Sequence, residues 1–142
     1  MGTYSHLLVG LDLSSESEPV LQKAIALAKA MNADISVVHT IEPLTFTYGA
    51  DMPIDLSETQ QIMEEQARIR LDKVIDEHQI TPKAAVIAVG NTAHELHRIA
   101  DEHNVDLIVV GSHGRHGLAL LLGSTANGVL HGANTDVLAV KV

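Results

Sequence analysis

The sequence predicts an α/β fold: a single-domain, doubly wound sheet of five parallel strands with helices on both faces, the Rossmann-like arrangement. Short apolar segments alternate with longer segments of helical periodicity along the whole chain, an order typical of parallel strands joined by crossover helices. The apolar segments are hydrophobic at consecutive positions, as expected of strands that helices cover on both faces. With 142 residues, we expect one domain spanning residues 1–142.

The first half of the chain predicts two strands around one helix. His6–Leu11 is an apolar run that ends before Asp12, and it predicts the first strand. Apolar residues then recur at helical spacing from about Ser17 to Met31, and Asn32 is a plausible stop for this helix. Ile35–Thr40 predicts the second strand.

A long connection and a charged helix follow. Residues 42–55 are too many for a simple turn, and such loops are usually functional or mobile. Tyr48 and Met52 in this loop could cover a binding crevice as a lid, or pack on a partner. Ser57 begins a capping-box pattern, and the helix is expected to run to about His78. Its apolar positions, which include Ile62 and Ile69, alternate with charged residues that we interpret as a solvated face.

The second half predicts three more strands. Lys83–Val89 is the third, and Thr92 is expected to cap the next helix, with Glu95 at capping-box spacing. Val105–Val110 predicts the fourth strand, and Asp136–Val142 predicts the last. Because parallel strands end at the same edge of a sheet, Asp12, Thr40 and Gly111 are expected to line one crevice at the switch point of strand order.

A glycine-rich stretch separates the last two strands. Six of the ten glycines fall between Gly111 and Gly132, and residues 125–131 predict a short helix capped by Ser124 or Thr125. A strand, a glycine loop and a helix N-terminus together favour an anion such as phosphate, because free N–H groups converge there. The alternative is a mobile loop that carries a solvated Arg115.

Composition excludes several classes of function. The chain has 9 Lys and Arg against 18 Asp and Glu, a net charge of −9, and this acidity opposes binding to nucleic acid or to anionic membranes. The absence of cysteine excludes disulfides, iron–sulfur clusters and thiol catalysis. No signal peptide and no apolar run of membrane-spanning length is evident, so a cytoplasmic protein is expected.

Two groups of residues invite a metal or catalytic interpretation. Among nine histidines, His94 with His97 and His113 with His116 are closely spaced, but neither pair has a clear third ligand. Ser124 has no evident base partner, and no Walker motif or nucleophile elbow is present. We therefore assign no metal ligand and no catalytic residue.

The glycine stretch and the two ends of the chain resemble the universal stress protein family, and its universal stress protein A branch in particular. The most specific segment is residues 109–114, Val-Val-Gly-Ser-His-Gly, followed by Gly123 and Ser124. Residues 6–17 and 136–140 add to a resemblance that spans the whole chain. It implies the adenine nucleotide alpha hydrolase-like version of the predicted fold.

The resemblance also implies an ATP site. ATP-binding members share a pattern of Gly, two residues, Gly, nine residues, Gly, then Ser or Thr. Gly111, Gly114, Gly123 and Ser124 match it, although the spacer of residues 115–122 is one residue short. By resemblance, Asp12 would lie beside ribose or adenine and the Thr40 backbone at the adenine edge. Gly111 and Gly114 would contact ribose and phosphate, and Gly123, Ser124 and Thr125 the terminal phosphates.

Two function classes follow as hypotheses. The first is a nucleotide-binding stress-response protein that takes ATP, with AMP or ADP as alternatives and Mg²⁺ as an accompanying ion; at most it is a slow ATPase. The second is a dimeric interaction protein of the same fold that uses no nucleotide. In either case the last strand, Val137–Val142, is an apolar edge that favours a homodimer. The alternative is a monomer whose edge is shielded by Lys141.

Overall fold

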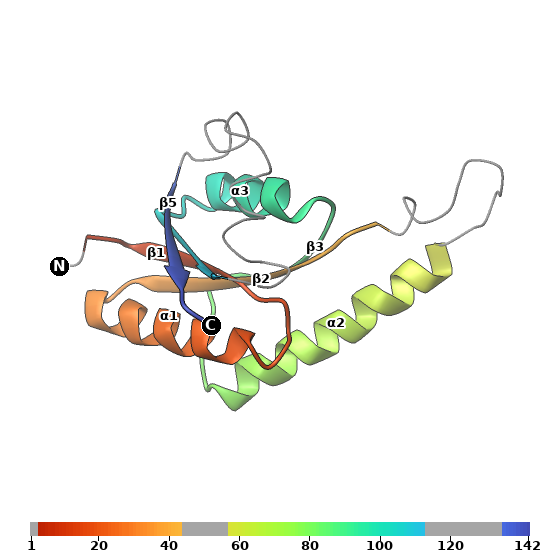
Figure 1. Ribbon diagram of the computed structural model, residues 1–142, viewed down its shortest axis with the longest axis horizontal. Helices are drawn as coiled ribbons and strands as arrows, with labels where there is room; N and C mark the ends of the chain where they lie inside the picture. The colour runs from red at the N-terminus through yellow and green to blue at the C-terminus, as the bar shows by residue number, and fades with distance from the viewer. Residues whose placement is uncertain (1–2, 44–56, 113–134) are drawn as a thin grey trace.

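The computed structural model describes residues 3–43, 57–112 and 135–142, and these form three helices and five strands (Figure 1). The elements in chain order are β1 (His6–Gly10), α1 (Ser17–Met31), β2 (Asp34–Ile41), α2 (Ser57–Glu77), β3 (Ala85–Val89), α3 (Thr92–Glu102), β4 (Leu107–Gly111) and β5 (Asp136–Val140). The short helix expected at residues 125–131 lies outside the described residues.

The five strands form one parallel sheet in the order β3-β2-β1-β4-β5, which confirms the predicted fold class. From β1 the chain moves outward to β2 and β3, and it then returns to the other side of β1 to add β4 and β5. The order therefore reverses between β1 and β4. In doubly wound sheets this switch point opens a crevice at the carboxyl ends of the strands.

Helices cover both faces of the sheet (Figure 1). On one face, α1 and α2 pack on side chains such as Leu7 and Val9, together with Leu71 of α2. On the other face, α3 contributes Leu96 and Ile99 to a second cluster that includes Leu8 and Val38. Because successive side chains of β1 point to opposite faces, both clusters draw on this central strand.

Local sequence signals fixed most helix ends, with one correction. Asn32 ends α1 in the left-handed conformation, with φ 54°, as expected of a C-terminal cap. Thr92 does not cap α3. The cap is Asn91, whose side chain accepts a hydrogen bond from the His94 amide at 3.0 Å. Thr92 is the first helical residue and is buried, and the Glu95 carboxylate binds Arg98 at 2.7 Å.

The amino ends of the central strands are held by a polar network in which His6 and Ser36 are buried. Asp106, just before β4, accepts hydrogen bonds from the backbone amides of Ser5 and His6 and from the Ser5 hydroxyl. The His6 ring contacts the His103 carbonyl through Nδ1 at 3.0 Å and the Ser36 hydroxyl through Nε2 at 2.7 Å. These bonds tie β1 to β2 and to the segment that enters β4.

Candidate functional site

Three predicted site residues lie at the carboxyl edge of the sheet. Val9 of β1 pairs with Val109 of β4. This register places Asp12, which follows β1, close to the height of Gly111 at the end of β4. Gly10 pairs with Val38, which places Asp12 level with Thr40. Asp12 is half-buried, whereas Thr40 and Gly111 are buried within their strands. The register of β1 with its two neighbours thus brings these three residues to one edge.

Asp12 begins a tightly bonded turn. Its Oδ1 accepts hydrogen bonds from the Ser14 amide at 2.9 Å and from the Ser14 hydroxyl at 2.6 Å. Leu13 between them is left-handed, with φ 63°. Helix α1 is preceded by Glu16, which makes no side-chain cap. Asp12 therefore shapes the loop after β1 and does not cap the next helix.

Helix α2 closes a cavity of about 150 Å³ against this loop. Arg70 is one of its lining residues, and its guanidinium donates a hydrogen bond from Nη2 to the Leu13 carbonyl at 2.7 Å. The buried His39 ring donates from Nδ1 to the Leu11 carbonyl at 2.7 Å, because a carbonyl can only accept. A carboxylate, an imidazole, a guanidinium and a side-chain amide thus line this hollow together with three apolar side chains. The lining residues are Asp12, His39, Ile41, Met63, Gln66, Ala67 and Arg70.

Sequence reasoning found only Asp12 among these lining residues. The charged residues of α2 were interpreted as a solvated face, and Arg70 is exposed, but its guanidinium also reaches the loop after β1. A usable signal was present: Met63, Ala67 and Arg70 recur at intervals of four and three residues, the spacing of one helix face. His39 was not singled out, although it alternates with the buried Val37 and so shares its face of the sheet.

The other predicted site residues do not line this cavity. Thr40 shares its sheet face with Val38, on the side of α3, and Gly111 ends β4. Gly114, Gly123, Ser124 and Thr125 lie outside the described residues. Their assignment to phosphate, and that of Asp12 and Thr40 to adenosine, stay predictions.

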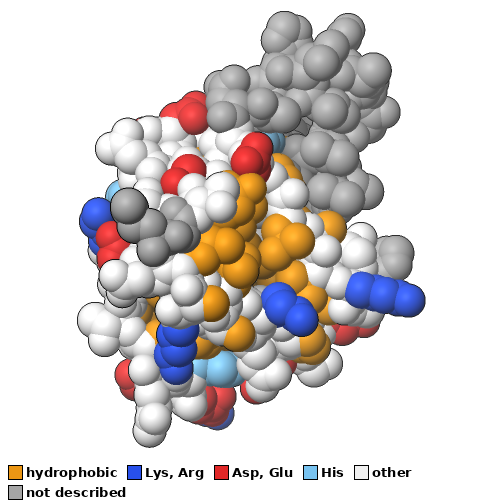
Figure 2. Space-filling model, turned by 90° about the vertical axis from the view of Figure 1, so that its left-hand side faces the viewer, with side chains coloured by type: hydrophobic (Ala, Val, Ile, Leu, Met, Phe, Trp, Pro, Cys, Tyr) orange, Lys and Arg blue, Asp and Glu red, His pale blue; other side chains and the backbone are white. Residues whose placement is uncertain are grey.

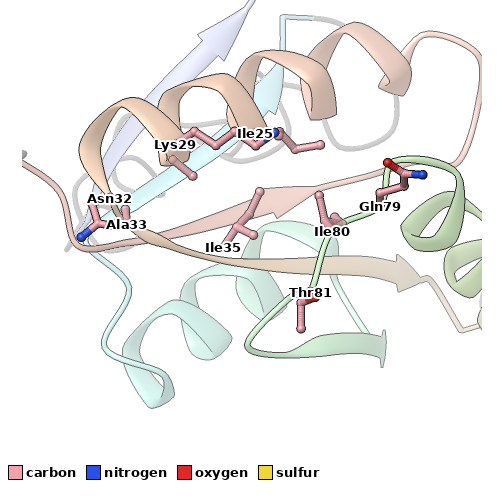
Figure 3. A pocket seen from close by; sticks show the side chains of 9 residues that line it. Ile25, Lys29, Asn32, Ala33, Ile35, Gln79, Ile80 and Thr81 are labelled. Atoms are coloured by element: carbon pink, nitrogen blue, oxygen red, sulfur yellow. The ribbon is translucent and has the colours of Figure 1, made fainter.

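A larger cavity of about 280 Å³ lies at the other end of the sheet (Figure 3). Ile25 and Lys29 of α1 line it together with Ile35 at the start of β2 and Ile80 before β3. It contains none of the predicted site residues. Because ligands of doubly wound sheets bind at the carboxyl ends of the strands, the smaller cavity is the candidate site.

Within residues 3–43, 57–112 and 135–142, no three His, Asp or Glu side chains gather as ligands for a metal ion. No helix in this part of the chain is long and apolar enough to cross a membrane.

The fold and the crevice define a doubly wound α/β protein with a candidate ligand site beside its switch point. The chain belongs to the universal stress protein family, whose family model matches residues 3–141. It is 39% identical to Universal stress protein A homolog 1 of Coxiella burnetii over 138 residues, which cover 96% of each chain. The predicted resemblance is therefore confirmed.

Two solved structures of similar proteins have the same fold. One, a universal stress protein in complex with cAMP, is 26% identical with a TM-score of 0.67, and the match covers 99% of this chain and 98% of the other. A second, the universal stress protein from Archaeoglobus fulgidus in complex with dAMP, is 22% identical with a TM-score of 0.61. That match covers 99% of this chain and all of the other, and it shows the same fold.

Proposed function

We propose that this protein binds an adenine nucleotide at the carboxyl ends of β1, β2 and β4, as a stress-response regulator and not as an enzyme. The observation that carries the proposal is the half-buried Asp12 in its ordered turn, beside a cavity next to the switch point. A carboxylate at this place in a doubly wound fold accepts hydrogen bonds well from ribose hydroxyls. The cAMP complex of a similar protein supports an adenine nucleotide as the ligand.

We propose ATP as the natural ligand, with AMP and ADP as the alternatives and Mg²⁺ as the accompanying ion. The glycines of residues 111–124 support a triphosphate, because a glycine loop leading to a helix start presents free N–H groups to phosphate oxygens. The spacer that is one residue short falls within the predicted phosphate segment. The comparison of the three nucleotides therefore decides how much of the phosphate chain is held.

Calorimetric titration of ATP, ADP and AMP, with and without Mg²⁺, tests the site. We expect saturable binding that Asp12→Asn weakens by roughly tenfold, the loss expected for one charged hydrogen bond. The double change Gly114→Val with Ser124→Ala is expected to abolish ATP binding.

Asp34→Asn is the matched control for this titration. It removes the same charge at the other end of β2, where Asp34 pairs with Lys83 at 3.5 Å. It should leave binding unchanged. If no nucleotide binds or stabilises the wild type at millimolar concentration, the proposal is wrong, and the interaction protein that uses no nucleotide becomes the better hypothesis.

We also propose a homodimer through the edge formed by β5. In the described part of the sheet, β5 has a neighbour on one side only, and its Val137, Leu138 and Ala139 are half-buried. The open edge of β5 alone carries this proposal. Figure 2 shows a further gathering of hydrophobic side chains, with basic side chains among them, on the side of the molecule that lies at the left of Figure 1. An apolar strand edge of this kind favours pairing with a second copy.

The direction of the backbone groups of β5 gives a specific test. Val140 pairs with Gly111, and its carbonyl accepts a hydrogen bond from the Ser112 amide at 2.8 Å. Because bonding alternates along a strand, the Ala139 amide points away from β4. Ala139→Pro should therefore remove an outward donor while sparing the pairing with β4. We expect sedimentation equilibrium to show a dimer in the wild type and in Ala139→Ser, and a monomer in Ala139→Pro. A wild type that stays monomeric at high concentration would contradict the dimer.

A further inference from the structure

Arg70 belongs to α2, yet it bonds to the loop that carries Asp12. Its Nη2 donates to the Leu13 carbonyl at 2.7 Å, across a sequence separation of 57 residues. The same side chain lines the cavity that Asp12 lines. Arg70 therefore connects an element outside the predicted site to the loop that holds the principal predicted ligand contact.

The loop that Arg70 contacts has an unfavourable backbone conformation. Leu13 adopts φ 63°, a region that residues with a side chain occupy at a free-energy cost. The Leu13 side chain packs against the core formed with α1 and α2. This packing and the bond from Arg70 both favour the observed conformation. Since Asp12 and Ser14 flank Leu13, the direction of the Asp12 carboxylate depends on the same conformation.

We propose that Arg70 is a positioning residue for the ligand site: by holding the Leu13 carbonyl it keeps the turn at residues 12–14 left-handed and the Asp12 carboxylate in place for the ligand. The inference rests on the proposed nucleotide function. It adds that α2 contributes to ligand binding, because the position of this helix determines whether Arg70 can hold the loop that carries Asp12. Any shift of α2 along β2 and β3 would then alter the affinity for nucleotide.

Amide hydrogen exchange in the ligand-free protein tests the positioning directly. The Ser14 amide donates to Asp12 Oδ1, so its protection reports whether the turn is formed. We expect Arg70→Ala to lower the protection of Ser14. Arg68→Ala is the matched control, because Arg68 also lies on α2 and donates to a backbone carbonyl, that of Ala85, at 2.9 Å. It should leave Ser14 unchanged.

Calorimetric titration of ATP into a set of four proteins then tests the link to binding. The proteins are wild type, Arg70→Ala, Leu13→Asn, and the double variant. Arg70→Ala should weaken binding roughly fivefold to tenfold, the factor expected for one net hydrogen bond. Asparagine occupies the left-handed region more readily than leucine, so the loss caused by Arg70→Ala should be smaller in the Leu13→Asn background. Arg70→Lys, which retains one donor, should restore part of the affinity.

The possible results distinguish the positioning role of Arg70 from the proposed nucleotide binding. Unchanged Ser14 protection in Arg70→Ala overturns the positioning role, whether or not nucleotide binds. An equal loss of affinity in both Leu13 backgrounds also overturns it, because that result indicates direct contact between Arg70 and the ligand. Loss of Ser14 protection in a protein whose wild type binds no nucleotide would confirm the positioning of the turn and refute the nucleotide function.

Discussion

At the scale of single residues, the buried His6 shows how one polar side chain can join several segments of the fold. Nδ1 faces the His103 carbonyl and must donate to it. Ser36 Oγ accepts from the Ala84 amide at 3.1 Å and has one proton to give, which fits an acceptor at Nε2. The His6 ring thus joins β1 to β2 and to the segment between α3 and β4.

Asp106 makes the stability of the same end of the sheet depend on pH. Burial acts to raise the pKa of this carboxyl group, but bonds from the His6 and Ser5 amides and the Ser5 hydroxyl outweigh it, and the pKa is lowered. A lowered pKa in the folded state means that the stabilisation is present above the ordinary value of about 3.9 and disappears as the pH falls through the folded-state pKa.

Asp106→Asn is therefore expected to lower the free energy of unfolding by about 1 kcal/mol at neutral pH, after allowance for solvent screening. The difference from the wild type should shrink as the pH falls below about 4. Urea denaturation at a series of pH values measures both effects. Asp101→Asn, an exposed change on α3, is the control. A constant difference across the whole range would show that the charge of Asp106 does not contribute.

At the scale of elements, the ends of α2 were predicted within one residue, but its buried face was only partly predicted. Ala67 and Leu71 are buried, whereas Ile62 and Ile69 are exposed by 54% and 67%. Periodicity identified the helix because apolar residues recur along it. Periodicity could not predict which of the overlapping apolar stripes of α2 is buried, because the buried stripe depends on where the helix crosses the sheet.

Two substitutions on α2 test this assignment. Leu71→Ala should lower the free energy of unfolding by about 2–5 kcal/mol, because it leaves a cavity at a fully buried position. Ile69→Ala, two residues away, should change it by less than about 0.5 kcal/mol. Urea denaturation of both variants measures the difference. Similar losses for the two would place Ile69 in an interface that the isolated chain does not reveal.

At the scale of the whole molecule, the fold class followed from the sequence, and much of the site did not. Alternating strands and helices imply a parallel sheet, and the rule that ligands bind at the carboxyl ends correctly brought Asp12 and Gly111 to one edge. The spacing of Met63, Ala67 and Arg70 indicates a shared helix face, but it does not show that Arg70 reaches the loop after β1. That contact depends on the packing of α2 over β2 and β3, a long-range property.

The polar network of His6, Ser36 and Asp106 lies at the end of the sheet opposite to the crevice. These stabilising bonds thus lie at the amino ends of the strands, whereas the ligand site is proposed at their carboxyl ends. Substitutions of cavity-lining residues that are not buried, such as Gln66, should then be accepted with little loss of folding, which makes this scaffold a favourable parent for randomised libraries. Selection on such a library could change ligand preference while the polar network at the amino ends of the strands keeps the variants folded.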